Sequence, residues 1–147
     1  MSIGRICQRD VDVATENESA QCIAERMRQR TVGALVIVNT QKKPIGILTD
    51  RDLAIRLVAE GLDAATTTVA EVMTTGPKTV SEETAIESAL SLMRSGSFRR
   101  LPVVDNAGKL VGLVTLDDIL MLLASELGDA GALIDRETPR AVASHLS

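Results

Sequence analysis

Apolar positions early in the chain follow the spacing of a helix. Between residues 20 and 27, apolar side chains occur at Ala20, Ile23, Ala24 and Met27. This i, i+3, i+4, i+7 spacing places them on one helical face, so we expect an amphipathic helix. A second helix is predicted over residues 50–60. It is expected to end at Gly61, because glycine is the residue that most often follows a helix C-terminus.

Continuous apolar runs in the same region predict strands instead. The sequences "GALVIV" (residues 33–38) and "IGILT" (residues 45–49) flank the polar turn "NTQKKP", and both are typical of buried strands. Residues 11–19, "VDVATENES", predict a short strand followed by a turn. With the two helices, these strands give the order β-α-β-β-α.

The second half of the chain predicts the same order of elements. These are the strand "KTV", a helix containing Ile86, Ala89, Leu90 and Met93, the strands "LPVVD" and "LVGLVT" around the turn "NAGK", and a helix from about Asp117. Thr68 is expected to cap a short helix between the halves. Neither half is large enough to bury its sheet comfortably alone. We therefore expect an α/β (α+β) fold in which two β-α-β-β-α repeats pack sheet to sheet about a pseudo-two-fold axis.

The two halves also match residue by residue. A shift of 66 positions, without a gap, lays "PIGILTDRDLAIRLVAE", from Pro44, over "LVGLVTLDDILMLLASE", from Leu110. The same shift pairs Gly46 with Gly112, Thr49 with Thr115 and Asp52 with Asp118. Matches at one shift over this span indicate a tandem duplication. We divide the chain into a first repeat (residues 1–66), a second repeat (residues 67–127) and a poorly patterned tail (residues 128–147), in which His145 is expected to be a solvated bystander.

Composition narrows the classes of function. The 147 residues are 45% hydrophobic and 24% charged, as expected of a globular protein. A net charge of −4, no Trp, no Tyr and a single Phe argue against a nucleic-acid binder, which needs basic surface or stacking platforms. No apolar run approaches the roughly 20 residues that cross a bilayer, and the first residues show no hydrophobic signal core. We expect a cytoplasmic protein that binds neither nucleic acid nor membrane.

The stretch "GILTDRD" permits two interpretations. Thr49 and Asp52 have the spacing of a capping box, in which each side chain bonds to the backbone of the other at a helix start. The second copy at Thr115 and Asp118 favours an additional role, because a hydroxyl and a carboxylate beside a helix N-terminus suit the hydroxyl groups of a ribose. Cap and ribose site are compatible.

A carboxylate repels phosphate, so a phosphate-bearing ligand would need cations nearby. Arg99 and Arg100 stand just before the strand "LPVVD", where their guanidinium groups are suited to bind phosphate. The alternative is that they pair with surface carboxylates. The equivalent residues of the first repeat are Gly33 and Ala34, which carry no charge.

The repeated β-α-β-β-α unit, the motifs "GILTDRD" and "GLVTLDD" and the segment "RRLPVVD" resemble a tandem pair of CBS domains, or Bateman module. The resemblance covers roughly residues 3–126. It implies clefts between the repeats that bind adenosine derivatives such as AMP, ADP, ATP, NAD or S-adenosylmethionine. It also implies pairing into disc-shaped homodimers.

The resemblance further implies which residues form each cleft. One cleft would contain Thr115 and Asp118 at the ribose, Leu113 beside the base, Arg99 and Arg100 at the phosphate, and Asp12, Val13, Val32 and Gly33 on the base side. The other would contain Thr49, Asp52 and Ile47, closed by Lys78, Thr79, Phe98 and Arg99. If only one cleft holds a phosphate-bearing ligand firmly, the sequence favours the one at Thr115.

Three classes of function follow from these features. The first is a sensor that requires no cofactor and binds an adenine nucleotide as its ligand. An unidentified protein partner is compatible with this function. The second is a ligand-free assembly module, which the helix "DDILMLLASEL" favours because it is apolar on nearly every face. The third is an enzyme. We expect no catalytic residues and no metal site, because no nucleophile–base constellation, histidine cluster or CxxC pair is visible.

Overall fold

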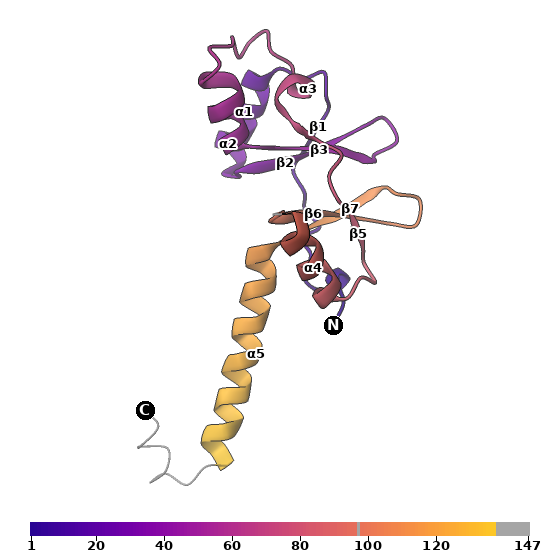
Figure 1. The fold of residues 1–147 in the computed structure, drawn as a ribbon, viewed down its shortest axis with the longest axis vertical. Coiled ribbons are helices and arrows are strands. Elements are labelled where there is room, and N and C mark those ends of the chain that lie inside the picture. Colours follow the sequence, from indigo (N-terminus) through magenta and orange to yellow (C-terminus); the bar gives the residue numbers. More distant parts are fainter. Residues whose placement is uncertain (97, 138–147) are drawn as a thin grey trace.

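The computed structural model describes residues 1–96 and 98–137, which form two stacked α/β units and a long C-terminal helix (Figure 1). The first unit contains β1 (Val13–Ala14), α1 (Ala20–Arg30), β2 (Ala34–Val38), β3 (Pro44–Thr49), α2 (Asp50–Asp52), the π-helical turn η2 (Leu53–Val58), α3 (Val69–Val72) and β4 (Thr74–Thr75). The second contains the 3-10 turn η1 (Ile3–Arg5), β5 (Val80–Ser81), α4 (Ile86–Gly96), β6 (Arg100–Val104), β7 (Leu110–Thr115) and α5 (Leu116–Glu137). The predicted β-α-β-β-α order is confirmed in both units, while η1 and β4 were not predicted.

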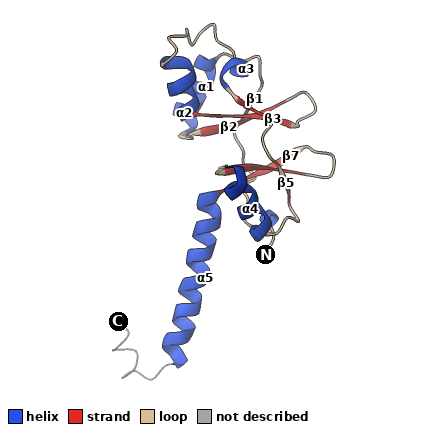
Figure 2. Ribbon diagram, in the orientation of Figure 1, coloured by secondary structure: helices blue, strands red, loops and turns tan. Residues whose placement is uncertain are grey.

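The strands form two separate sheets with the same core topology. Their orders are β1-β2-β3-β4 and β5-β6-β7. In each sheet the first strand pairs in parallel with the second, and the second pairs antiparallel with the third. The helices of each unit lie on the outer side of its sheet, so the sheets face each other (Figure 2). This is the predicted sheet-to-sheet packing. The hairpin ends add one direct link, in which the Leu110 amide donates to the Lys42 carbonyl at 2.9 Å.

Helix α1 is present as predicted, and its buried face is narrower than the predicted one. The Ser19 hydroxyl accepts a hydrogen bond from the Cys22 amide and caps the N-terminus. Ala20, Ile23 and Met27 are buried, which confirms most of the predicted face. Ala24 is exposed, so the prediction was wrong there. The three buried residues are enough to fix the helix on its sheet.

The predicted helix over residues 50–60 is present but not uniformly α-helical. It starts as α2 and continues as the π-helical turn η2. It ends at Val58, before the predicted end at residue 60, and Gly61 follows in a turn with a φ of +69°, a left-handed conformation that favours glycine. Leu53 and Leu57 point into the core from this segment.

Each unit completes its hydrophobic core with a segment that lies outside its own repeat in the sequence. The core of the first unit includes Val69, Val72 and Met73, which follow the first repeat. The core of the second unit includes Ile3, with Ile6 packed against it, although both precede the first unit. The N-terminus accordingly lies beside α4 (Figure 1). The two units therefore cannot be separated by a single cut in the chain.

Helix α5 extends well beyond the body of the molecule (Figure 1). It continues to Glu137 and so includes part of the segment interpreted from the sequence as a poorly patterned tail. His145 lies outside the described residues. Within residues 1–96 and 98–137, no helix has the length and apolar character that a membrane crossing requires.

Candidate functional site

Two cavities are lined by residues of both units. The first, the Thr49 cleft, has a volume of about 210 Å³ and is lined by Ile47, Thr49, Asp52, Thr74, Phe98, Arg99 and Arg100. The second, the Thr115 cleft, has a volume of about 190 Å³ and is lined by Gln8, Asp10, Val11, Asp12, Val32, Gly33, Ala34, Arg100, Leu113 and Thr115.

The same shift of 66 positions relates the two clefts. It pairs Ile47 with Leu113, Thr49 with Thr115, Thr74 with Gln8, Phe98 with Val32, Arg99 with Gly33, and Arg100 with Ala34. The strand registers agree, because Thr49 lies opposite Ala34 and Thr115 lies opposite Arg100. The clefts are therefore pseudo-equivalent places in a duplicated fold, and they differ in the residues that line them.

The Thr-x-x-Asp pairs form capping boxes in both repeats. The Thr49 hydroxyl accepts from the Asp52 amide at 3.1 Å, and the Asp52 carboxylate accepts from the Thr49 amide at 3.0 Å. In the second repeat, the Thr115 hydroxyl accepts from the Asp118 amide at 3.1 Å, and the Asp118 carboxylate accepts from the Thr115 amide at 2.9 Å. The predicted capping role is confirmed. Each box uses one oxygen of its carboxylate, Oδ2, and leaves the second for other partners.

The second carboxylate oxygen has a different neighbour in each cleft. Asp118 Oδ1 accepts a hydrogen bond from Gln8 Nε2 at 3.2 Å. Asp52 Oδ1 lies 3.9 Å from Arg56 Nε, at the outer limit of an ion pair. The oxygen suited to a ribose hydroxyl is therefore held by a neutral amide in the Thr115 cleft and only loosely engaged in the Thr49 cleft.

Gly46 and Gly112 allow the close approach of another chain segment. A Cβ at Gly46 would lie 3.1 Å from the Thr74 carbonyl oxygen, and a Cβ at Gly112 would lie 3.0 Å from the Gln8 carbonyl oxygen. These carbonyls belong to the segments that run beside β3 and β7. The glycines therefore let Thr74 and Gln8 reach the clefts, which accounts for both glycines without a ligand.

Cys7 lies beside this contact, because its Sγ would be 2.9 Å from a Cβ at Gly112. Burial raises the pKa of the Cys7 thiol, so it stays protonated at neutral pH. A protonated, half-buried thiol acts here as a small packing group.

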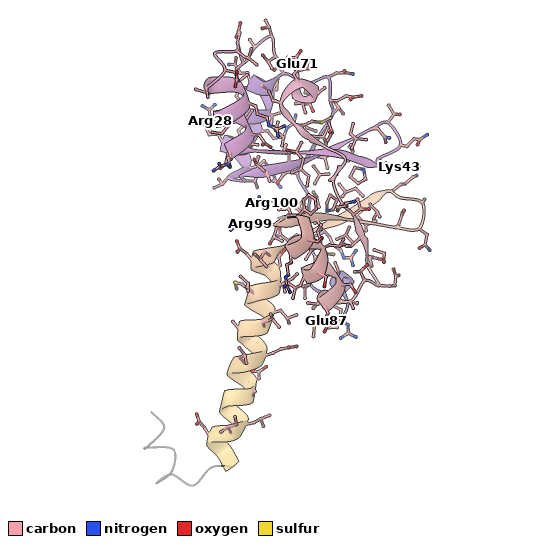
Figure 3. All side chains as sticks on the ribbon, viewed as in Figure 1. Arg28, Lys43, Glu71, Glu87, Arg99 and Arg100 are labelled. Atoms are coloured by element: carbon pink, nitrogen blue, oxygen red, sulfur yellow. The ribbon has the colours of Figure 1, made fainter. Side chains whose placement is uncertain are left out.

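The two arginines lie where the units meet (Figure 3). Arg100 lines both clefts, whereas Arg99 lines the Thr49 cleft. Both also border a smaller cavity of about 170 Å³ next to Thr115 and Asp117. Among the described residues, neither arginine forms an ion pair with a carboxylate. The alternative that they pair with surface acids is therefore not what the described structure shows.

Acidic side chains border the other cleft. Asp12 lines the Thr115 cleft with its side chain 14% exposed, and its Oδ1 accepts from Arg30 Nε at 2.7 Å. Asp10 lines the same cleft and pairs with Arg30 at 3.2 Å, but its side chain is 93% exposed. One arginine thus balances two carboxylates on this side.

Most of the residues singled out from the sequence line the cleft to which they were assigned. In the Thr49 cleft these are Ile47, Thr49, Asp52, Phe98 and Arg99, and in the Thr115 cleft they are Asp12, Val32, Gly33, Arg100, Leu113 and Thr115. Asp118 adjoins the Thr115 cleft through its bond to Gln8. Val13, Lys78 and Thr79 do not line either cleft, and Val13 is 41% exposed on β1. Arg99 was assigned to both clefts; it lines the one at Thr49 and, on the other side, borders the smaller cavity next to Thr115.

Sequence reasoning missed five lining residues, which are Gln8, Asp10, Val11 and Ala34 in the Thr115 cleft and Thr74 in the Thr49 cleft. Gln8 and Thr74 enter the clefts from segments that precede each repeat's first strand, and no periodicity marks them. Asp10 and Val11 also line the Thr115 cleft, and they belong to the same segment before β1 as Gln8 does. Extending the 66-residue shift to the first ten residues would have paired Gln8 with Thr74, which is the one signal available.

A larger and more apolar cavity lies outside the two clefts. It has a volume of about 480 Å³ and is lined by Leu90, Met93, Arg94, Phe98, Arg99 and Leu116. It contains no Thr-Asp pair, so size alone does not identify the site. Among the described side chains, no group of three or more His, Cys, Asp or Glu residues is placed to hold a metal ion.

Comparison with known proteins identifies the family. The CBS domain model matches residues 3–59 and residues 69–125. The chain belongs to the CBS-domain family. An uncharacterized protein of Methanopyrus kandleri is 40% identical over 122 residues, which cover 83% of this chain and 62% of that protein. The chain thus spans less than two thirds of that relative's length.

Solved CBS pairs share the fold and include ligand complexes. The CBS domain pair of protein MJ0100, in complex with 5-methylthioadenosine and S-adenosyl-L-methionine, has a TM-score of 0.76 and 26% identity over 86% of this chain and 98% of that one. CBSX2 in complex with AMP has a TM-score of 0.72 and 25% identity over 84% of this chain and 96% of that one. Proteins with this fold therefore include binders of adenosine-containing ligands.

Proposed function

We propose that this CBS pair is a non-catalytic regulatory module that binds adenosine-containing ligands in the Thr49 and Thr115 clefts. The candidates are AMP, ADP, ATP, NAD and S-adenosylmethionine. The observation that carries the proposal is the duplication of one pocket, in which a Thr-Asp capping pair faces residues of the opposite unit. The ligands of the MJ0100 pair and of CBSX2 support the same class of compound.

The local geometry is suited to an adenosine. The aliphatic side chains of Ile47 and Leu113 offer apolar surface to a base in a chain with a single aromatic residue. The free lone pairs of the capping carboxylates can accept from the ribose hydroxyls, since the helix cap needs only one oxygen of each. Ligand binding would then link the two units across the interface at which they meet.

Calorimetric titration tests the proposal directly. AMP, ATP, NAD and S-adenosylmethionine are titrated separately into the full chain. Saturable binding of at least one adenosine compound is expected, and guanosine monophosphate serves as the base-specificity control. Absence of binding by every adenosine compound, even in the millimolar range, would refute the sensor function. The lack of Trp and Tyr gives a second readout, because a co-purified adenine nucleotide would dominate the ultraviolet spectrum near about 260 nm.

We also propose that the chain pairs as a homodimer through its exposed helix faces. Ile55 on η2 is 53% exposed and Met121 on α5 is 73% exposed, and the 66-residue shift makes them equivalent. Large apolar side chains at equivalent exposed places suggest a surface covered by a second copy. Such a surface lets ligand binding in the clefts change the arrangement of two chains, provided that the ligand favours one arrangement.

The exposed helix favours one alternative function, a ligand-free assembly module. Leu120, Leu123, Leu127, Ala130 and Ile134 follow a heptad spacing on α5, and the four large side chains among them are 38–73% exposed. Sedimentation of the wild-type chain and of Leu127→Glu measures the assembly. A dimer that Leu127→Glu dissociates, in a chain that binds no adenosine compound, would support the assembly module in place of the sensor. An unchanged sedimentation coefficient would exclude this helix from the interface.

A further inference from the structure

We propose that the two clefts select different adenosine ligands by charge: the Thr49 cleft takes a compound with an anionic 5′ phosphate, and the Thr115 cleft takes one with a neutral or cationic 5′ group. This inference rests on the proposed function, because it assumes that both clefts bind adenosine. It goes further by assigning a chemical class to each cleft and by naming the residues that impose the difference.

The first step is the set of cations at the Thr49 cleft. Arg99 and Arg100 both line it, and neither is paired with a carboxylate among the described residues. The one acidic residue that lines this cleft is Asp52, and Arg56 lies 3.9 Å from it. Two guanidinium groups without acidic partners can bind a phosphate through charge-assisted hydrogen bonds.

The second step is the loss of positive charge at the equivalent positions of the Thr115 cleft. Gly33 and Ala34 stand where the other cleft has Arg99 and Arg100, so the equivalent positions of the Thr115 cleft carry no charge. Arg100 reaches the Thr115 cleft as well, but it is the one basic residue among those that line it.

The third step is the excess of carboxylate around the Thr115 cleft. Asp10 and Asp12 line it and share the single cation Arg30, and Asp118 adjoins it. In the small cavity next to Thr115, which Arg99 and Arg100 also border, Asp117 stands at the place that Arg51 occupies in the first repeat. A phosphate entering this cleft would meet the carboxylates of Asp10, Asp12 and Asp118, while Arg100 is the one basic residue that lines the cleft itself. A sulfonium or an uncharged thioether would not be repelled.

The charge preference differs from the one that the sequence alone suggested. In the sequence, Arg99 and Arg100 belong to the same repeat as Thr115, and this predicted that a phosphate would bind in the Thr115 cleft. In the folded chain the Arg99 side chain lines the cleft of the opposite unit, because the two sheets face each other. Both arginines of the second repeat therefore reach the Thr49 cleft, and Arg100 also lines the cleft of its own repeat.

Two probes and two variants test the inference by calorimetry on the full chain. The probes are AMP, which carries a phosphate, and S-adenosylmethionine, which carries a sulfonium. The wild-type chain is expected to bind one of each simultaneously, without competition. Arg99→Gln is expected to weaken AMP about tenfold or more and to leave S-adenosylmethionine unchanged, since each charge-assisted bond is strong. Asp12→Asn is expected to weaken S-adenosylmethionine and leave AMP unchanged.

Lys109→Gln is the matched control, because it removes an exposed positive charge on the β6–β7 turn that lines neither cleft. Circular dichroism of each variant reports whether it has folded. Competition between the two probes for a single site, or equal weakening of both by Arg99→Gln, would overturn the charge selection while leaving the sensor function intact. Failure of both probes to bind the wild-type chain would overturn the sensor function as well.

Discussion

Gln8 Nε2 lies 3.2 Å from Asp118 Oδ1, so the first residues of the chain contact the Thr115–Asp118 capping pair of the second repeat. The equivalent residue of the other cleft is Thr74, a shorter side chain for which no such bond to Asp52 is found among the described residues. Two segments far apart in the sequence thus occupy equivalent positions, but among the described residues only Gln8 donates a hydrogen bond to the capping carboxylate beside it.

This difference predicts the effect of exchanging the two residues. Gln8→Thr introduces the residue found at the equivalent place and frees Asp118 Oδ1. We expect the affinity of the Thr115 cleft for S-adenosylmethionine to rise about threefold or more, because the ribose hydroxyl no longer competes with an amide. Titration of both proteins measures the change. An unchanged or lower affinity would show that Gln8 does not compete with the ligand.

The capping aspartates give a second prediction, on which sequence and structure disagree. The sequence predicts that Asp118→Ala weakens AMP binding more than Asp52→Ala, because the arginine pair adjoins Thr115. The residues that line the clefts favour the reverse, with the larger loss in Asp52→Ala. Both variants remove one capping box at a cost of about 1 kcal/mol, so each is a control for the other's loss of stability. The ratio of the two AMP dissociation constants decides between them.

The close contact at Gly112 gives a prediction about stability. In Gly112→Ala the added Cβ would lie 2.9 Å from Cys7 Sγ and 3.0 Å from the Gln8 carbonyl oxygen. We expect a loss of about 1–3 kcal/mol in the free energy of unfolding, because the N-terminal segment must move away. Gly128→Ala is the control, since nothing lies within 4 Å of that site, and helix propensity predicts a gain of about 0.5–1 kcal/mol. Urea denaturation measures both, and equal effects would contradict the contact.

The ion pair between Glu18 and Arg26 predicts a dependence on pH. The hydrogen bond from Arg26, 2.5 Å long, holds the pKa of the Glu18 carboxyl below its ordinary value. A carboxyl whose pKa is lowered by folding stabilises the fold above its unfolded pKa, and this contribution is lost as the pH falls through the folded pKa. Glu18→Gln should therefore reduce the stability at pH 7, and the gap to the wild type should close as the pH falls below 4.5. A gap that is the same at pH 7 and pH 3 would contradict this assignment.

The sequence alone determined the features that depend on neighbouring residues or on a repeated spacing. The spacing of Ile23 and Met27 fixes the buried face of α1, and the Thr-x-x-Asp spacing fixes two capping boxes, because a cap depends on residues within one turn. The 66-residue shift indicated the duplication, and the resemblance to a pair of CBS domains implied the two clefts. These features could be read from the chain because the interactions that produce them lie a few residues apart or recur exactly one repeat later.

Only the tertiary structure decided which segments meet. No local pattern places Gln8 beside Leu113 or Thr74 beside Ile47, since each contact depends on a chain segment crossing from one unit to the other. The approach of Thr74 explains Gly46, and the packing of the two sheets brings Arg99 to the cleft of Thr49. The charge of each cleft is a sum over residues from both units. That sum depends on how the two sheets face each other, and this packing is a long-range property of the folded chain.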